Sequence, residues 1–155
     1  MTRFTKALAV VMSLGLALAG LGCGDEHGHK EGEGHGGPVT VEVPDNYKDA
    51  VAKIESLKAE MGGLIEKGDL GKVHPPAEKI KKVAEKLPEL ATKAGMKAAD
   101  VKEVNEAART LQGLFDEMDK AADAGKKEET RAAFAKYDAP MAKLKAHVEH
   151  AGHSH

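Results

Sequence analysis

Histidine is the residue type in this chain best suited to chemistry, and most of its histidines gather near the two ends of the sequence. One cluster lies in "DEHGHKEGEGHGG" (25–37) and the other in "HVEHAGHSH" (147–155). Together the clusters contain His27, His29, His35, His147, His150, His153 and His155. Neutral imidazoles suit soft or borderline divalent ions, so the clusters predict a site for Cu, Zn or Ni at the termini. Without a thiolate ligand, its affinity should be modest and its selectivity low.

The clusters also have a simpler interpretation, in which histidine only supplies polarity or pH-dependent charge to solvated segments. The remaining histidine, His74, lies in "VHPPAEK" (73–79). We interpret it as a residue at the start of a helix, and a ligand role for it is the less favoured alternative.

Composition argues against several function classes. The chain has a net charge of −2 and only 3% aromatic residues, which gives little reason to expect a nucleic-acid partner. Beyond the first 22 residues the only serines are Ser56 and Ser154, and no glycine-rich phosphate loop occurs. Mixed runs such as "AEKIKKVAEK" are typical of a solvated helix face. We therefore do not expect an enzyme.

The N-terminus has the pattern of an export signal. "MTRFTK" is basic, "ALAVVMSLGLALAGLG" (7–22) is apolar, and Cys23 follows directly. A cysteine in this place resembles the lipobox of bacterial lipoproteins, although Gly20 stands where that motif usually has leucine. The resemblance implies a signal peptide over residues 1–22, lipidation of Cys23, and a lipid anchor in a bacterial membrane, facing the periplasm or the cell surface. Ordinary cleavage after Ala17-Leu18-Ala19 and an uncleaved membrane anchor are the alternatives, and the apolar run is short for a full span.

Residues 23–44 predict a lipidated cysteine followed by a disordered tether rich in glycine, histidine and glutamate. Only "VTVEV" (39–43) alternates as a strand does, and the sequence offers it no evident partner strand.

From residue 45 onward, apolar residues recur at spacings of three and four, as on one face of a helix. The four predicted stripes are Tyr47, Val51, Ile54, Leu57, Met61, Leu64 and Ile65; Val73, Ala77, Ile80, Val83, Ala84, Leu87, Leu90 and Ala91; Val101, Val104, Ala108, Leu111, Leu114, Phe115 and Met118; and Ala133, Phe134, Tyr137, Met141, Leu144 and Val148. With short connections they predict an all-α, antiparallel up-down-up-down four-helix bundle over residues 45–150, followed by a histidine-rich tail over 151–155. This topology would bring the start of the first helix and the end of the fourth to one end, where the two histidine clusters could meet.

Local signals refine these helices. Gly95 and Gly125 predict helix ends, and Asp100 with Glu103 predicts a capping box at the start of the third helix. Pro88 and Pro140 predict kinks or interruptions. Gly62-Gly63 and Gly113 indicate close backbone packing or looseness, with a ligand cavity near Met61 and Met118 as the less favoured alternative.

Haem-binding four-helix bundles offer a further comparison. The c-type proteins attach haem through Cys-x-x-Cys-His in the fourth helix, whereas "LKAHVEH" (144–150) contains no cysteine, so we expect no covalent haem. The b-type proteins pair a methionine early in the first helix with a histidine late in the fourth, and only His147 fits that pattern. Non-covalent haem binding is therefore the third alternative.

The stretch "IEKGDLGKVHPPAEKIKKVAEKLPELA" (65–91) resembles small helical domains of uncharacterised bacterial envelope proteins, and this resemblance implies no functional residue. We thus expect an envelope lipoprotein that binds a divalent metal ion through its termini, for buffering or delivery. The alternative is a structural or interaction module that contacts another envelope protein. The oligomeric state stays open.

Overall fold

A computed structural model describes residues 39–149 and residue 151, and the regular secondary structure of this part of the chain is entirely helical. In order, the elements are α1 (Tyr47–Lys67), the 3-10 helix η1 (Leu70–Lys72), α2 (His74–Lys93), α3 (Ala98–Asp123), α4 (Lys127–Ala135) and α5 (Asp138–Ala146). The predicted all-α class is therefore confirmed for these residues. No helix among them combines the length and the apolar character needed to cross a membrane.

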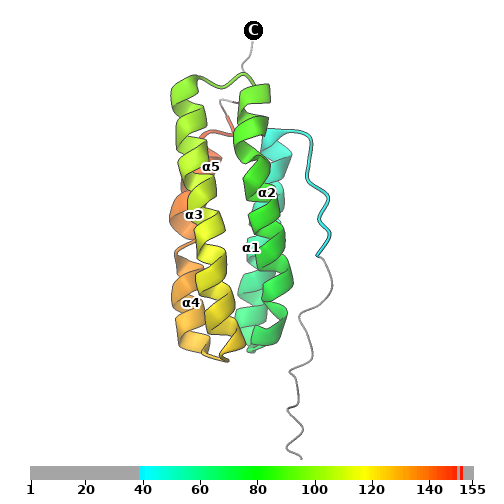
Figure 1. The fold of residues 1–155 in the computed structure, drawn as a ribbon, viewed down its shortest axis with the longest axis vertical. Helices are drawn as coiled ribbons and strands as arrows, with labels where there is room; N and C mark the ends of the chain where they lie inside the picture. Colours follow the sequence, from blue (N-terminus) through cyan, green and yellow to red (C-terminus); the bar gives the residue numbers. More distant parts are fainter. Residues whose placement is uncertain (1–38, 150, 152–155) are drawn as a thin grey trace, which may run out of the picture. The chain divides into compact units, whose positions relative to one another are not determined.

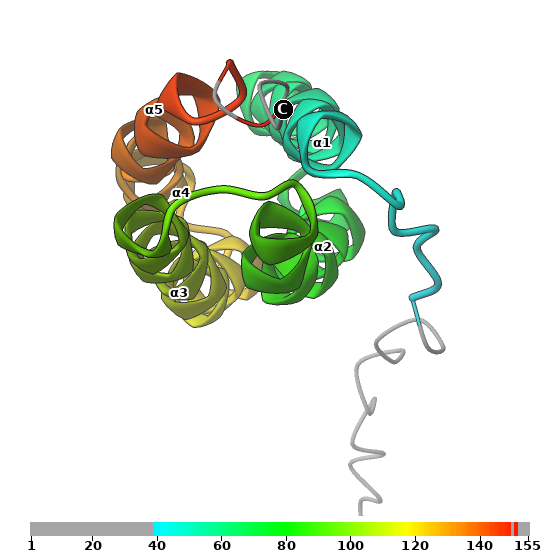
Figure 2. The same ribbon diagram turned by 90° about the horizontal axis from the view of Figure 1, so that it is seen from above.

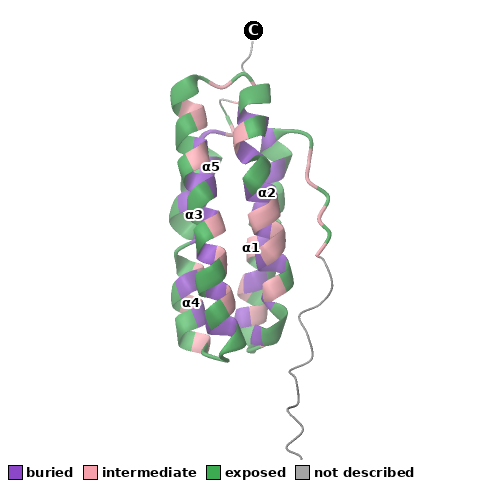
Figure 3. Cartoon of the chain, in the orientation of Figure 1, coloured by how far each residue is buried: buried purple, intermediate pink, exposed green. Residues whose placement is uncertain are grey.

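The helices form a bundle around an apolar core. α2 packs between α1 and α3, and α3 also packs against α4 and α5. α4 and α5 follow one another along the same side of the bundle (Figure 1), and we call them the α4–α5 column. Seen from above, this column and α1 complete the ring around the core (Figure 2). Buried residues lie on the faces that the helices turn toward one another (Figure 3).

The core is built from the predicted apolar stripes. All members of the second stripe are buried, and the other three stripes each bury most of their members. The partly buried members, which pack at the margin of the core, are Leu64, Val101, Phe115, Phe134 and Val148. Since each large aliphatic side chain contributes about 1.5–3 kcal/mol when fully buried, this core is the main source of stability.

Two of the predicted helix ends are confirmed. Gly95 and Gly125 follow α2 and α3 with φ values of 74° and 67°, in the left-handed region that favours glycine. In each case the next backbone N–H bonds back into the last turn, from Met96 to the Ala91 carbonyl and from Lys126 to the Ala121 carbonyl. These bonds satisfy carbonyls that the end of a helix would otherwise leave without a partner.

The predicted capping box at Asp100 is wrong. α3 begins at Ala98, with Lys97 before it and no side-chain cap, so Asp100 lies inside the first turn. Ala98 and Ala99 favour helix strongly enough to extend it upstream, and a carboxylate in the first turn is still stabilised by the helix dipole. Glu103 instead contacts the side chain of His147.

The two internal prolines behave differently. α2 runs unbroken through Pro88, so the predicted interruption does not occur there; the apolar neighbours Leu87 and Leu90 are buried and hold the helix in place. The fourth predicted helix is interrupted, after Ala135, which separates α4 from α5. Pro140 lies in the first turn of α5, and its ring would clash with the carbonyl of Lys136 in a continuous helix. The break therefore falls one turn before the proline.

The alternating segment 39–43 forms no strand, yet its side chains alternate between partly buried and exposed positions. Val39, Val41 and Val43 are partly buried, whereas Thr40 and Glu42 are exposed. Val41 and Val43 pack against the core, and the Lys82 ammonium donates to the Val39 carbonyl. This part of the predicted tether therefore lies along α2 (Figure 1), because an extended chain can bury every second residue against a helix as well as in a sheet.

Candidate functional site

Most of the predicted ligands lie outside the described residues. The structure describes His147 among them. The predicted residues outside its range are His27, His29, His35, His150, His153 and His155, together with the predicted lipidation site Cys23.

His147 is part of the folded bundle. It follows the last residue of α5, and its side chain is only 8% exposed. Its Nε2 lies 3.0 Å from Glu103 Oε2, and its Nδ1 lies 4.0 Å from Asp100 Oδ1. Both carboxylates belong to the beginning of α3, so His147 joins the end of α5 to the start of α3.

This geometry changes how His147 can act. In a helix that continued to residue 150, the spacing of three would put His147 and His150 on neighbouring parts of one face, but α5 ends at Ala146. A metal ion at Nε2 would have to share or displace the contact with Glu103. The pairing could not be read from the sequence, because 44 residues separate the two partners. A ligand role for His147 stays a prediction.

The chain segments next to the two histidine clusters lie partly at the same end of the bundle. Asp45, Asn46 and Ala151 line one small pocket together with residues from the end of α2. Nearby, the buried Tyr47 hydroxyl donates to the Leu144 carbonyl over 2.9 Å. The N-terminal segment then turns along α2, where Val39 lies beside Lys82. Residues 45–46 and 151 are therefore close together, whereas residue 39 lies near the middle of α2.

His74 makes contacts beyond those of a residue that only begins a helix. It opens α2, and its Nδ1 lies 2.5 Å from Asp119 Oδ1 near the end of α3. Its Nε2 lies 3.5 Å from Glu78 Oε2, one turn further along α2. The ring also packs edge-to-face on Phe115, with the ring centroids 5.5 Å apart. We call His74, Glu78 and Asp119 the His74 cluster.

The charge around the His74 cluster is balanced by lysines. Lys82 Nζ lies 2.9 Å from Glu78 Oε1, and this contact, with His74 as a smaller contribution, holds the pKa of Glu78 below its ordinary value. The i, i+4 spacing of His74 and Glu78 was visible in the sequence. Asp119 was not, because only the packing of α2 on α3 brings it near.

Neither histidine belongs to a complete metal centre. Within residues 39–149 and 151, no group of three histidine, cysteine or acidic side chains is arranged to hold a metal ion. The predicted terminal site therefore depends on histidines that lie beyond this part of the chain.

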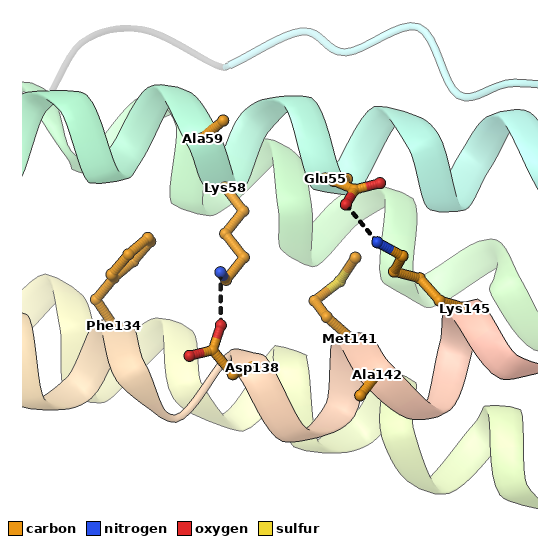
Figure 4. A pocket seen from close by; sticks show the side chains of 8 residues that line it. All are labelled: Glu55, Lys58, Ala59, Phe134, Asp138, Met141, Ala142 and Lys145. Atoms are coloured by element: carbon orange, nitrogen blue, oxygen red, sulfur yellow. Dashed lines mark hydrogen bonds and ion pairs between the residues drawn. The ribbon is translucent and has the colours of Figure 1, made fainter.

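A groove separates α1 from the α4–α5 column (Figure 4). It encloses about 580 Å³ and is lined by Glu55, Lys58, Ala59, Phe134, Asp138, Met141, Ala142 and Lys145. Two ion pairs cross it, Lys58 with Asp138 and Lys145 with Glu55, each over 2.7 Å. We call it the α1 groove.

Of the glycines singled out in the sequence, Gly62 packs against Phe134, which lines this groove. A methyl group added at Gly62 would lie 3.1 Å from the Phe134 ring, so Gly62 allows a close approach between α1 and α4. An added methyl at Gly63 or Gly113 would meet nothing within 4 Å. Met61 and Met118, considered as the lining of a ligand cavity, are fully buried in the core. Close packing thus explains Gly62, and nothing in the structure explains Gly63 or Gly113.

Compared with protein-family models, with curated proteins and with solved structures, the chain shows no significant match.

Proposed function

We propose that this protein is an exported lipoprotein, anchored through Cys23, that binds divalent copper, zinc or nickel through its histidine-rich segments and buffers or delivers the ion in a bacterial envelope. The observation that carries the proposal is the distribution of histidine. Seven of the eight histidines lie in two short terminal segments, in a chain whose helices carry mostly lysine, glutamate and aspartate as their polar residues. Imidazole nitrogen is the natural ligand for these ions in the absence of thiolate.

An up-down-up-down bundle, with the α4–α5 column as its fourth helix, is part of this proposal. The bond from Tyr47 to the Leu144 carbonyl supports it, since it joins the beginning of α1 to the end of α5. The pocket shared by Asp45, Leu90 and Ala151 supports it as well, since it joins the beginning of α1 to the end of α2. Among the proposed ligands that the structure describes, His147 is also used in the packing of this bundle.

The test is a calorimetric titration of the processed, untagged chain with Cu(II), Zn(II) and Ni(II). The first variant replaces His27, His29 and His35 by asparagine, the second replaces His150, His153 and His155, and the third combines all six changes. We expect the tightest saturable binding of the unmodified chain to be lost in the combined variant, with unchanged helical content by circular dichroism. If one ion takes ligands from both clusters, each three-site variant alone will lose most of the affinity.

Equal binding by the unmodified chain and the combined variant would contradict the proposal. So would binding no tighter than that of peptides 25–37 and 147–155 measured separately, because the segments would then act as ordinary histidine-rich peptides.

The α1 groove favours a second candidate function, that of an interaction module. Its lining includes Phe134 and Met141, and the Lys145–Glu55 ion pair across it is more than half exposed and therefore easily exchanged for contacts with another protein. A photo-crosslinking residue at Ala142 should then capture one defined envelope protein in cells, whereas the same residue at the exposed position Glu106 on α3 should not. Identical crosslinking at both positions would reject this function.

A further inference from the structure

We propose that His74 and Glu78 form a second metal site on the bundle itself, in which Asp119 orients the imidazole and water completes the coordination of Zn(II), Cu(II) or Ni(II). This site is independent of the terminal histidines and of the function proposed above.

The argument begins with the tautomer of His74. At 2.5 Å, the contact between Nδ1 and Asp119 Oδ1 has the length of a strong charge-assisted hydrogen bond, and we assign a proton to Nδ1 on that ground. In the neutral ring Nε2 is then the atom with a lone pair. A metal-binding histidine almost always donates its other N–H to a carboxylate or carbonyl in this way, which fixes the ring and raises the basicity of the ligating nitrogen.

The second step is the distance on the other side of the ring. Nε2 and Glu78 Oε2 are 3.5 Å apart, which exceeds the usual length of a charge-assisted N–H···O bond. Two ligands of one tetrahedral ion, each bound at about 2.0–2.1 Å, lie roughly 3.3–3.4 Å apart. The observed separation is therefore close to that of two ligands of one cation, and a bound ion would take the place of the direct contact between the two side chains.

The third step is the preorganisation of both ligands. His74 and Glu78 are four residues apart on α2, which puts them on one face of the helix. The edge-to-face contact with Phe115 fixes the plane of the ring. Lys82 Nζ lies 2.9 Å from the other carboxylate oxygen of Glu78 and restrains that side chain.

The site can also be reached from solvent. The His74 side chain is 26% exposed and that of Glu78 is 24% exposed, so a hydrated ion can exchange some of its water for these ligands without unfolding the helix. One nitrogen and one oxygen ligand favour a borderline ion over Mg²⁺ or Ca²⁺, which prefer oxygen. With two protein ligands the affinity should be lower than that of a three-ligand centre.

The test uses the full processed chain in which His27, His29, His35, His150, His153 and His155 are all asparagine, titrated with Zn(II). Calorimetry gives the affinity, and ¹⁵N NMR of the histidine rings identifies the nitrogen that binds. We expect one zinc ion per chain and a large shift of the His74 Nε2 resonance. Glu78→Gln should weaken binding by about tenfold or more, whereas Glu85→Gln, an exposed change on the same helix, should leave the affinity within about twofold.

The Asp119→Asn variant tests whether Asp119 orients the His74 ring without binding the ion itself. It should weaken zinc binding by about tenfold and also move the proton of His74 away from Nδ1 in the NMR spectrum before zinc is added. The inference is overturned if zinc leaves the His74 resonances unchanged, or if Glu78→Gln and Glu85→Gln have equal effects. Both nitrogens of His74 protonated at neutral pH, with zinc absent from the ring, would show that the cluster is an ion pair that joins α2 to α3.

The outcomes for the two proposals can be told apart. If the six asparagine changes leave zinc affinity unchanged and His74 shifts, the terminal site fails and the His74 site stands. If the changes remove all binding, the His74 site fails and the terminal site stands.

Discussion

The interface between α2 and α3 and the interface between α1 and the α4–α5 column use charged side chains in different ways. Between α2 and α3, His74 and Asp119 are both about three-quarters buried and in close contact. Across the α1 groove, Lys145 and Glu55 are each more than half exposed, although their ion pair is also short. The comparison teaches that contact distance alone does not rank these pairs, because water screens the exposed one and the exposed side chains lose more rotamer freedom when they pair.

The largest expected effect is on the α2–α3 side. Asp119→Asn removes a charge-assisted bond from a mostly buried ring and should lower the free energy of unfolding by about 1–2 kcal/mol. Lys145→Met, the matched change in the α1 groove, should alter it by less than about 0.5 kcal/mol. Urea denaturation at pH 7 measures both. Equal losses of unfolding free energy in the two variants would show that burial does not distinguish the two ion pairs.

The second prediction concerns two buried tyrosines of the core, one on α1 and one between α4 and α5. Tyr47 donates to the Leu144 carbonyl, whereas the Tyr137 hydroxyl has no hydrogen-bond partner within the described residues. Burial raises the pKa of both phenols, so both hydroxyls stay protonated at neutral pH. Tyr47→Phe should cost about 1 kcal/mol, and Tyr137→Phe should be neutral or stabilising, since it removes a polar group that lacks a partner. Thermal unfolding of the two variants decides this, and a larger loss for Tyr137→Phe would reveal a water or another partner at that hydroxyl.

The third prediction sharpens the account of how closely α1 approaches α4. Gly63→Ala should stabilise the protein by about 0.5–1 kcal/mol, because alanine favours helix and its methyl group meets nothing. Gly62→Ala gains the same propensity but must move the Phe134 ring, so its net gain should be smaller or negative. Denaturant midpoints of the two variants give the difference. Equal stabilisation would mean that Phe134 moves freely and that the groove is loosely packed.

The smallest effect is the pH dependence of Glu78. Its pKa is lowered below 4.5 in the folded protein, chiefly by Lys82. The stabilisation is therefore present above the unfolded-state pKa and is lost as the pH falls through the folded-state pKa. We expect the stability difference between the unmodified chain and Glu78→Gln, a few tenths of a kcal/mol at pH 7, to decrease as the pH falls below the ordinary carboxylate range. Urea unfolding between pH 3 and pH 7 measures it.

A Lys82→Met background provides the control for the Glu78 measurement. Most of the pH-dependent difference should disappear there, because the main cause of the lowered pKa is gone. A difference that persists would assign the shift to His74 instead.

Much of the fold was predictable because it depends on local properties of the chain. The apolar period of Ile80, Val83 and Leu87 requires a helix with one buried face, and Gly95 ends it because it adopts a left-handed conformation without strain. The start of α3 was predicted wrongly, because the capping signal of Asp100 competed with the helix propensity of two preceding alanines. The element that packs against residues 39–43 could not be predicted either. Alternation indicates which side chains are buried but not which part of the chain covers them.

The candidate sites were less predictable, because their partners are distant in sequence. His147 was predicted as a ligand from its type and its neighbours, and the structure adds Glu103 from α3. His74 appeared to be a residue at the start of a helix until α3 placed Asp119 against it. In both cases the chemistry of a histidine depends on which nitrogen meets a carboxylate, and a linear pattern does not contain that information.

By itself, the sequence determined the helical class, the faces that become the core, most helix ends and the clustering of histidine at the termini, because these follow from residue type and short-range spacing. Only the tertiary structure decided that α2 continues through Pro88, that α4 and α5 are separate, and that His74 and His147 each face carboxylates on α3. These outcomes depend on the balance between local cost and packing energy, and packing energy exists only once distant helices have come together.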